Sequence, residues 1–213
     1  MTTSKPESLS DYREKAPKID WLLGQLEKIK VREEKAIVFC EFRNIQRLLQ
    51  HYIEEVFAFR ADIINGDTAA TSSHAASRQG RIKEFQKRPG FGVIILSPIA
   101  VGFGVNIQAA NHVIHYTRTW NPAKEDQATD RAYRIGQTKD VFVYYPVVTA
   151  TDFSTFDVKL DQLLNKKREL ASDMLNGSGD LAPGDFNIAD VVPSAAAGDL
   201  DKRVDLETAL RAC

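Results

Sequence analysis

The chain has 213 residues, of which 43% are hydrophobic and 27% charged, and its formal net charge is -1. This composition is typical of a protein with an apolar core, and it excludes the strongly basic field that would by itself attract nucleic acid. Two cysteines, Cys40 and Cys213, are too few for a disulfide framework or a cysteine metal site and suit a reducing compartment. No apolar run reaches the roughly 18 residues of a membrane span, and the polar N-terminus is unlike a secretory signal, so we expect a cytoplasmic protein without membrane contact.

Helical and strand patterns alternate along the chain. A helix is indicated where apolar residues recur every three or four positions, and a buried strand where a short run is continuously apolar. The expected helices cover residues 17–30, 44–57, 78–87 and 122–135, and the expected strands cover residues 35–40, 59–64, 92–97, 112–116 and 141–148. Such alternation predicts an α/β fold with a mostly parallel sheet and helices on both faces.

The two ends of the chain differ from this central part. Residues 1–16 are polar and without periodicity, which predicts a flexible N-terminal segment. After the α/β domain at residues 17–150, a long amphipathic helix is expected within residues 151–176, from about 152 to 175. Residues 177–213 contain GSGD and SAAAGD and indicate a linker or tail. We therefore expect one α/β domain with appendages, cut from a longer chain.

One short segment, QATDRAYRIGQ, has a helix pattern with clear ends. Asn121 suits the N-cap and Pro122 the first helical position, while Glu125 suits the positive end of the helix dipole. At the other end, Arg134 falls in the last turn and Gly136 at the terminating position. The helix follows a predicted strand, so it begins at the carboxyl edge of the sheet, where open α/β sheets bind ligands.

Four polar side chains lie along this helix at spacings of three and four: Gln127, Asp130, Arg131 and Arg134. These spacings predict one stripe on the helix surface. Two arginines on such an edge fit a clamp for phosphate, because the guanidinium fork binds two oxygens and stays charged. From the spacing alone, the alternative is a solvated face with an ion pair between Asp130 and Arg134.

The segment also resembles motif VI of the Swi/Snf-type ATPases of helicase superfamily 2, Q-A-x-D-R-x-x-R-I-G-Q. Neighbouring segments resemble the family's other motifs in the family's order: KAIVFCEF resembles motif IV, ILSPIAVGFGVNIQAANHVIHYTRTWNP resembles motif V with its extension, and INGDTAATSSHAASRQGRIKEFQ resembles the block between them. The helix after residue 150 resembles the brace that follows the second lobe. The resemblance covers residues 17–175 and implies a RecA-like second helicase lobe followed by a C-terminal bracing helix.

The resemblance implies roles for the polar residues of the stripe. Arg131 and Arg134 would act as catalytic arginines on the phosphates of ATP, together with Gln127. Asp130 would contribute to ATP binding.

Further candidates lie in and around motifs IV and V. Gly104 and Asn106 are candidate ATP contacts, with Asn106 on the ribose, and Ser97 is a candidate DNA-phosphate contact through its hydroxyl and the free backbone N–H groups nearby. Arg43 and Lys124 are further candidates for DNA phosphate. Each has a plainer interpretation, a glycine-shaped turn for motif V and solvated charges for Arg43 and Lys124.

Aromatic side chains near these motifs are less informative. Trp120 either presses on DNA or fills the lobe surface. His112 and His115 have no cysteine or carboxylate at ligand spacing, so we expect packed or exposed side chains and no metal site.

The sequence departs from the family at two points. The usual A-G-G of motif V is Ala100-Val101-Gly102, and Tyr133 replaces the usual histidine of motif VI. The sequence contains no G-x-x-x-x-G-K-[ST] phosphate loop and no acidic D-E-x-H pair. We therefore expect ATP with Mg²⁺ to be bound mainly by a first lobe outside this chain, without which the chain is inactive.

These observations predict the C-terminal lobe of an ATP-dependent translocase on double-stranded DNA. Its expected partners are duplex DNA, the N-terminal RecA-like lobe of the same enzyme, and proteins of a defence, repair or transcription complex. The compact spacing of the motifs favours a bacterial or phage enzyme. Two alternatives remain open: a non-catalytic DNA- or protein-binding module that keeps the fold, and the lobe of an RNA helicase.

Overall fold

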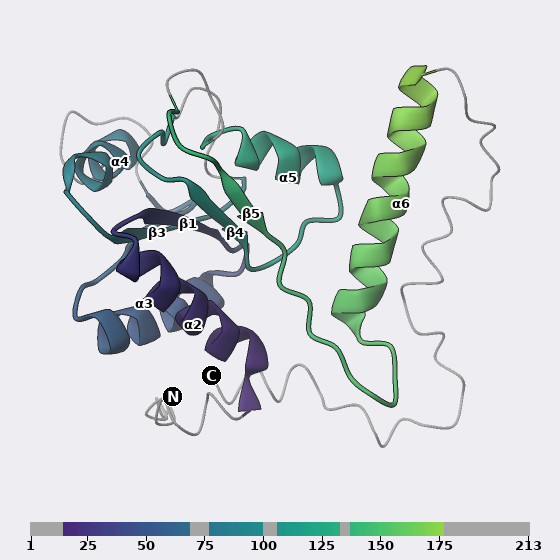
Figure 1. Cartoon of the computed structure of the whole chain (residues 1–213), viewed down its shortest axis with the longest axis horizontal. Coiled ribbons are helices and arrows are strands. Elements are labelled where there is room, and N and C mark those ends of the chain that lie inside the picture. The colour runs from purple at the N-terminus through teal and green to yellow at the C-terminus, as the bar shows by residue number, and fades with distance from the viewer. Residues whose placement is uncertain (1–14, 69–76, 100–105, 133–136, 177–213) are drawn as a thin grey trace. The chain divides into compact units, whose positions relative to one another are not determined.

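The computed structural model describes residues 15–68, 77–99, 106–132 and 137–176 (Figure 1). Contacts between Cα atoms divide the chain into two compact units, of which one is Arg13–Pro146 and the other contains Val147–Cys213. The terminal segments predicted to be flexible or linker-like lie outside the described residues, and our domain boundaries stay predictions.

The larger unit contains a five-stranded sheet in the order β2-β3-β1-β4-β5, and all four neighbouring pairs are parallel. Its strands are β1 (Lys35–Phe39), β2 (Asp62–Ile64), β3 (Gly92–Leu96), β4 (His112–His115) and β5 (Phe142–Tyr144). Its helices are α2 (Pro17–Val31), α3 (Arg43–Phe57), α4 (Arg78–Lys87) and α5 (Pro122–Thr129). The predicted α/β class with a parallel sheet is confirmed.

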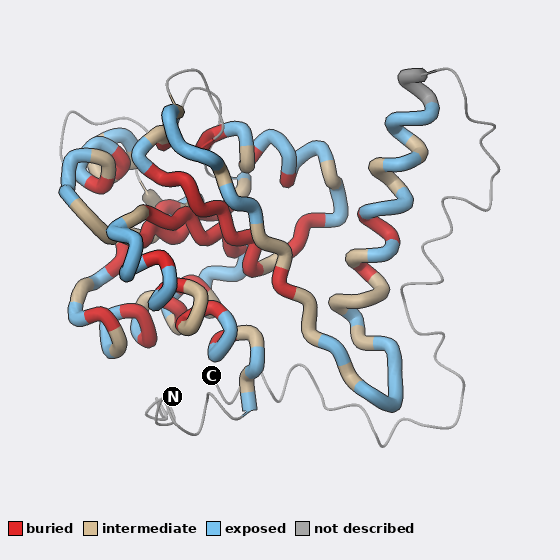
Figure 2. The backbone as a smooth tube through the Cα atoms, viewed as in Figure 1, coloured by how far each residue is buried: buried red, intermediate tan, exposed pale blue. Residues whose placement is uncertain are grey.

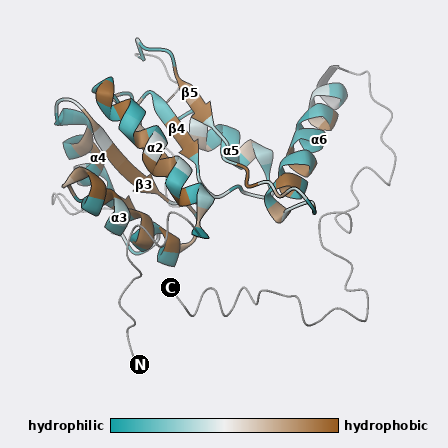
Figure 3. Cartoon of the chain, turned by 60° about the horizontal axis from the view of Figure 1, so that its bottom comes forward, coloured by the Kyte–Doolittle hydropathy of each residue, from teal (hydrophilic) through white to brown (hydrophobic). Residues whose placement is uncertain are grey.

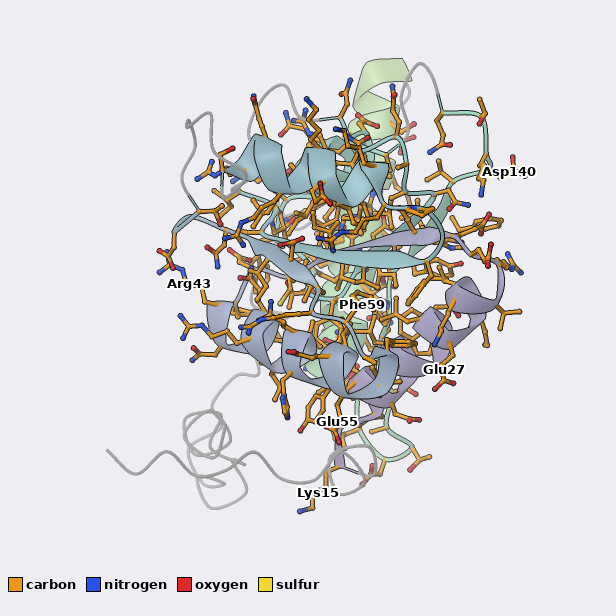
Figure 4. The ribbon with its side chains drawn as sticks, turned by 90° about the vertical axis from the view of Figure 1, so that its left-hand side faces the viewer. Lys15, Glu27, Arg43, Glu55, Phe59 and Asp140 are labelled. Carbon is orange, nitrogen blue, oxygen red and sulfur yellow. The ribbon has the colours of Figure 1, made fainter. Side chains whose placement is uncertain are left out.

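Helices cover both faces of this sheet, with α2 and α3 on one face and α4 and α5 on the other (Figures 1 and 4). The central strands are buried along most of their length (Figure 2), and Figure 3 shows their apolar character. Because side chains alternate between faces, Ile37 and Phe39 of β1 pack toward α4, where they meet Ile82 and Phe85 in one core cluster. Burial on both faces explains why these strands are continuously apolar in sequence and could be predicted from that pattern.

The two edge strands are shorter than predicted. β5 was expected at 141–148 but ends at Tyr144, and Pro146 shortly beyond it has no N–H to donate to a ladder. β2 was expected at 59–64 but begins at Asp62. Before it, Ala58 ends α3 in the left-handed conformation, and the Phe59 ring packs edge-on against Phe91 with centroids 5.7 Å apart. The apolar character of residue 59 therefore reflects packing in a turn.

The smaller unit contains α6 (Phe156–Asn176), which begins four residues later than the predicted 152. Thr155 caps it, since its Oγ1 accepts a hydrogen bond from the N–H of Val158 at 3.2 Å and donates to the carbonyl of Val148 at 2.5 Å. The N–H of Val148 in turn donates to Asp157 Oδ2 at 3.1 Å. The long helix is therefore present, while its bracing role stays a prediction. Within the described ranges, no helix is both long and apolar enough to cross a membrane.

Candidate functional site

The carboxyl ends of the three central strands are level with one another. In the registers of the sheet, Phe39 of β1 pairs with Leu96 of β3 on one side and with His115 of β4 on the other. The segments that follow these strands therefore leave the sheet side by side, at the edge where parallel sheets bind ligands. Arg43, Ser97, Trp120 and helix α5 all come from these segments, so the structure brings these sequence-predicted residues to one edge.

Helix α5 starts as its sequence predicts. Asn121 is the N-cap, its Oδ1 accepts a hydrogen bond from the N–H of Ala123 at 3.0 Å, and Pro122 occupies the first turn. This cap fixes where the chain leaves the carboxyl edge and turns into the helix.

Glu125 has a role that its sequence position did not reveal. Instead of facing solvent at the helix dipole, its side chain is fully buried and binds Arg118 through two hydrogen bonds of 2.8 and 3.0 Å. Glu125 Oε1 also accepts from the N–H of Thr119 at 3.0 Å, and the Arg118 guanidinium lies 4.3 Å from the centre of the Tyr145 ring. This two-pronged pair ties the segment after β4 to the helix that it leads into.

The predicted end of this helix is wrong. We expected it to continue to Arg134, but α5 ends at Thr129 and tightens into a turn, with the N–H of Ala132 donating to Thr129 O at 2.9 Å. The carbonyl of Arg131 accepts a hydrogen bond from the N–H of Ile107 at 2.9 Å, where a continuing helix would use it for its own ladder. Asp130 and Arg131 therefore lie beyond the end of the helix that was predicted to carry them. Arg134 and Gly104 lie outside the described residues, as do Tyr133 and the Ala100–Gly102 substitution.

Arg131 nevertheless has the features of an anion-binding side chain. Gln127 and Asp130 are exposed, but Arg131 is buried, with 8% of its surface accessible. Among the residues that the structure describes, its Nε has no hydrogen-bond partner. Burying a charged donor without a partner is unfavourable, so this guanidinium is suited to an anionic ligand at the carboxyl edge.

Two buried or half-buried glutamines join segments of this edge through hydrogen bonds, and neither was predicted from the sequence to have a role. Gln46 is fully buried, donates to Cys40 O at 2.6 Å and accepts from Asn65 Nδ2 at 2.8 Å, which joins the ends of β1 and β2. Gln137 donates to the carbonyls of Gln108 and Ala110 at 2.9 and 3.0 Å, which joins the end of motif VI to the segment after motif V. The final glutamine of the R-I-G-Q pattern was the available signal for Gln137.

The predicted DNA contacts Arg43, Trp120 and Lys124 are accessible. Trp120 is 44% exposed, and Lys124 lies exposed on α5. Arg43 is also exposed but forms a 3.0 Å ion pair with Asp67, which a phosphate would have to replace. Because exposed pairs of this kind contribute little free energy, that exchange is inexpensive.

The two described candidates from motif V differ in accessibility. Ser97 is buried, and its N–H donates to Ile64 O at 2.9 Å, so this amide is not among the free N–H groups that we expected there. Asn106 is exposed.

Two large apolar side chains at this edge were missed. Phe42 follows β1 and is 60% exposed, while Ile99 follows β3 and is 68% exposed. Together with Trp120 they give the carboxyl edge an apolar component beside its charges, which suits a surface that contacts another macromolecule.

Both histidines of β4 are packed, as expected. His115 binds Thr129 at 2.9 Å. His112, at the opposite edge of the sheet, binds Glu34 at 2.7 Å and Tyr144 at 3.1 Å. Burial lowers the pKa of His112, although its bond to Glu34 acts in the other direction. In the described part of the chain, no three His, Cys, Asp or Glu residues are grouped as a metal site.

Comparison with known proteins agrees with these features. The profile of the helicase conserved C-terminal domain matches residues 17–136. The chain is 59% identical over 176 residues to the Zorya protein ZorD of Escherichia coli O139:H28, covering 82% of this chain and 16% of that protein. It is 36% identical over 153 residues to the putative ATP-dependent helicase/translocase YwqA of Bacillus subtilis, covering 72% of this chain and 16% of that protein. The chain thus spans a small fraction of the length of these relatives.

Solved structures show the same fold. The Sulfolobus solfataricus SWI2/SNF2 ATPase core in complex with dsDNA matches with a TM-score of 0.56 at 33% identity, over 76% of this chain and 32% of that one. The C-terminal part of the Fun30 ATPase domain matches with a TM-score of 0.56 at 29% identity, over 80% of this chain and 47% of that one. The predicted RecA-like fold and family resemblance are confirmed. The chain belongs to the helicase conserved C-terminal domain family, as the C-terminal lobe of a Swi/Snf-type ATPase.

Proposed function

We propose that this chain is the second lobe of an ATP-dependent translocase that moves along duplex DNA. In this proposal, ATP with Mg²⁺ is held mainly by a first lobe, and the present lobe closes on its phosphates. The names of two matched proteins support the two halves of the proposal, since YwqA is a putative ATP-dependent helicase/translocase and the S. solfataricus SWI2/SNF2 core was solved with dsDNA.

The buried guanidinium of Arg131 is the observation that carries the proposal. Its Nε has no partner among the described residues, and its backbone is fixed by the bond from Ile107. A planar, permanently charged fork in this setting fits the oxygens of a phosphate. Bound ATP would supply the phosphoryl group that is transferred to water. Arg131 would bind its phosphates, and Arg134 would stabilise the charge that develops on transfer.

Other residues at the carboxyl edge have supporting roles in this proposal. Gln127 is assigned to catalysis beside the arginines. Asn106, with Gly104 and Asp130, is assigned to nucleotide binding, with the Asn106 amide on the ribose.

DNA is assigned to the exposed side of the same edge. Lys124 and Arg43 offer cations to its phosphates and Trp120 an aromatic surface, while the hydroxyl of Ser97, which is buried in the free lobe, is a further candidate contact. Phosphate contacts of this kind position a protein on DNA without reading its sequence, which a translocase requires.

The pathway is proposed from likeness alone. The identity to the Zorya protein ZorD, 59% over 82% of this chain, supports a role in the same system as that relative. The defence, repair or transcription complex that the sequence led us to expect stays a prediction.

Substitution of the two arginines in the full-length protein tests the proposal. We expect Arg134→Ala to lower DNA-stimulated phosphate release by about 10³–10⁵-fold with ATP binding nearly intact. Arg131→Ala should also be severe and should weaken nucleotide binding, and Arg131→Lys should rescue little because it loses the fork. Arg32→Ala, an exposed arginine at the opposite edge of the sheet, is the control and should change turnover little.

Two other results would contradict the proposal. Turnover within a few-fold of the parent in both arginine variants would favour a non-catalytic binding module. Turnover stimulated by RNA and not by duplex DNA would favour an RNA helicase.

A further inference from the structure

A groove of about 620 Å³ lies along the edge strand β2 and extends away from the carboxyl edge. Figure 4 is viewed from the side where α4 lies above this strand and α3 below it, with Arg43 labelled near one end. The groove is lined by Arg47, Gln50, Arg60, Ala61, Asp62, Ile63, Asn65, Asp67, Arg81 and Arg88. Four of these ten residues are arginines, and none is aromatic or lysine.

Both aspartates of the groove are already paired. Asp67 lies 3.0 Å from Arg43, and Asp62 lies 3.9 Å from Arg81. The negative charges inside the groove are therefore balanced by two arginines, which leaves the charge of the remaining arginines in excess.

Those remaining arginines are exposed and weakly held. Arg60 donates to the neutral Gln50 side chain at 3.2 Å, and Arg88 lies 3.6 Å from Glu84 one helical turn away. Arg47 forms no ion pair with any residue that the structure describes. Three guanidinium groups can thus turn toward a ligand without breaking a buried interaction.

The strand at the floor of the groove cannot readily accept another strand. Its two outward-facing carbonyls are occupied, that of Ala61 by Gln50 at 2.6 Å and that of Ile63 by Arg81 at 3.4 Å. A peptide adding to this edge would lose these backbone acceptors, on which strand addition depends. The binding capacity of the groove therefore lies in its guanidinium donors.

The composition of the groove favours a phosphate backbone over other anions. Guanidinium forks bind phosphate oxygens in pairs, whereas the bases of single strands and free nucleotides are bound mainly by stacking on aromatic side chains, which the lining lacks. Arg81 on α4 and Arg88 at the C-cap of that helix are seven residues apart, or about 10 Å, a span that covers several phosphates of one strand of a duplex.

We propose that the groove binds the phosphate backbone of duplex DNA as a second contact, beyond the carboxyl edge. It begins near that edge, where Asp67 meets Arg43, and continues along β2 to Arg60 and Arg88. The inference rests on the proposed function. It adds a second DNA-binding surface on the side of the lobe, which would guide the DNA.

Duplex binding by the 213-residue chain tests this, with a triple variant Arg47→Gln/Arg60→Gln/Arg88→Gln. The matched control Lys28→Gln/Lys83→Gln/Lys87→Gln removes the same charge from exposed positions outside the groove. Two of these positions, Lys83 and Lys87, are on α4, the helix that ends at the Arg88 C-cap. The slope of log K against log salt is negative, and each lost phosphate contact reduces its magnitude by about 0.9. We expect the groove variant to bind a 30-base-pair duplex more weakly, with a slope smaller in magnitude by about 2 to 3, and the control to change by less than 1.

Five further results bear on the inference. Circular dichroism and urea unfolding like those of the parent show that the groove variant is folded, which the exposure of all three residues predicts. Equal effects of the groove and control variants would overturn the inference, as would unchanged duplex binding with lost binding of a poly-glutamate peptide, which would assign the groove to an acidic protein. If Lys124→Gln weakens duplex binding and the groove variant does not, only this inference fails. If the parent does not bind duplex DNA at all, the proposed function fails as well.

Discussion

At the scale of single residues, the buried pair of Glu125 and Arg118 decides how the site is built. Burying a carboxylate costs desolvation free energy, which an ion pair offsets only when its geometry is close to ideal. Here Glu125 lies 2.8 Å from the Arg118 guanidinium in a two-pronged contact, and its carboxylate also accepts a hydrogen bond from the N–H of Thr119. The pair joins two segments that both belong to the carboxyl edge, so it positions the residues that we propose to contact ligand.

Removing one partner should therefore be costly. We expect Glu125→Ala to lower the free energy of unfolding by about 3–5 kcal/mol, measured by urea denaturation, because it leaves the buried Arg118 without its carboxylate. Glu125→Gln should cost less, since an amide oxygen still accepts a hydrogen bond. Asp126→Asn, at the exposed neighbouring position, should change stability by less than about 0.5 kcal/mol, and a similar loss there would show that helix charge, not the pair, is responsible.

The pair of His112 and Glu34 predicts how stability depends on pH. Burial holds the pKa of His112 below its ordinary value, and the hydrogen bonds from His112 and Lys139 lower the pKa of Glu34 although burial raises it. In both cases the unfolded chain takes up its proton at higher pH than the folded one, so stability is lost as pH falls, beginning near the ordinary histidine pKa of about 6.5.

Urea unfolding between pH 7.5 and 5 measures this dependence. The free energy of unfolding of the parent should decrease toward pH 5, and His112→Gln should decrease less steeply. His51→Gln, at an exposed position on α3, should keep the slope of the parent. A His112→Gln slope equal to that of the parent would contradict the assignment.

At the scale of elements, the beginnings of helices follow local sequence, whereas α5 ends through a non-local contact. Asn121 and Pro122 predicted the first turn of α5 correctly, because capping involves only neighbouring residues. The end of α5 was mispredicted because the carbonyl of Arg131 accepts a hydrogen bond from the N–H of Ile107, which lies far earlier in the sequence. Local propensity contains no information about such a bond.

The N-cap offers a test at this scale. Asn121→Ala should lower the free energy of unfolding by about 1 kcal/mol, since the N–H of Ala123 loses its acceptor, and Asn121→Asp should retain most of the stability. Asn44→Ala, an exposed position inside α3, is the control and should not destabilise. A loss in the control as large as in Asn121→Ala would show that the cap is not the cause.

The same distinction explains how much of the sheet and site was predictable. Strands β1 and β3 were predicted to within one residue because burial on both faces makes them apolar throughout. The edge strands were overestimated because their apolar residues also pack in turns. The carboxyl edge and its polar residues were predictable from order and motif, whereas the partners of Glu125 and Gln46 depend on which segments the fold brings together.

At the scale of the whole molecule, the chain contains one lobe and no phosphate loop in its sequence. We expect the purified 213-residue chain to release phosphate from ATP no faster than buffer, with or without duplex DNA. The full-length protein is the positive control. Clear DNA-stimulated turnover by the chain alone would contradict the assignment of ATP binding to a first lobe.

The backbone bond between Ile107 and Arg131 links the two ligands of the proposed translocase. It joins Ile107 of motif V to Arg131, the residue whose guanidinium lies buried at the carboxyl edge. If DNA shifts the first segment and thereby changes the affinity for nucleotide, then nucleotide must change the affinity for DNA by the same factor, because coupling free energy is reciprocal. In the proposed translocase, this hydrogen bond of 2.9 Å would be a physical route by which the state of the nucleotide sets how tightly DNA is bound.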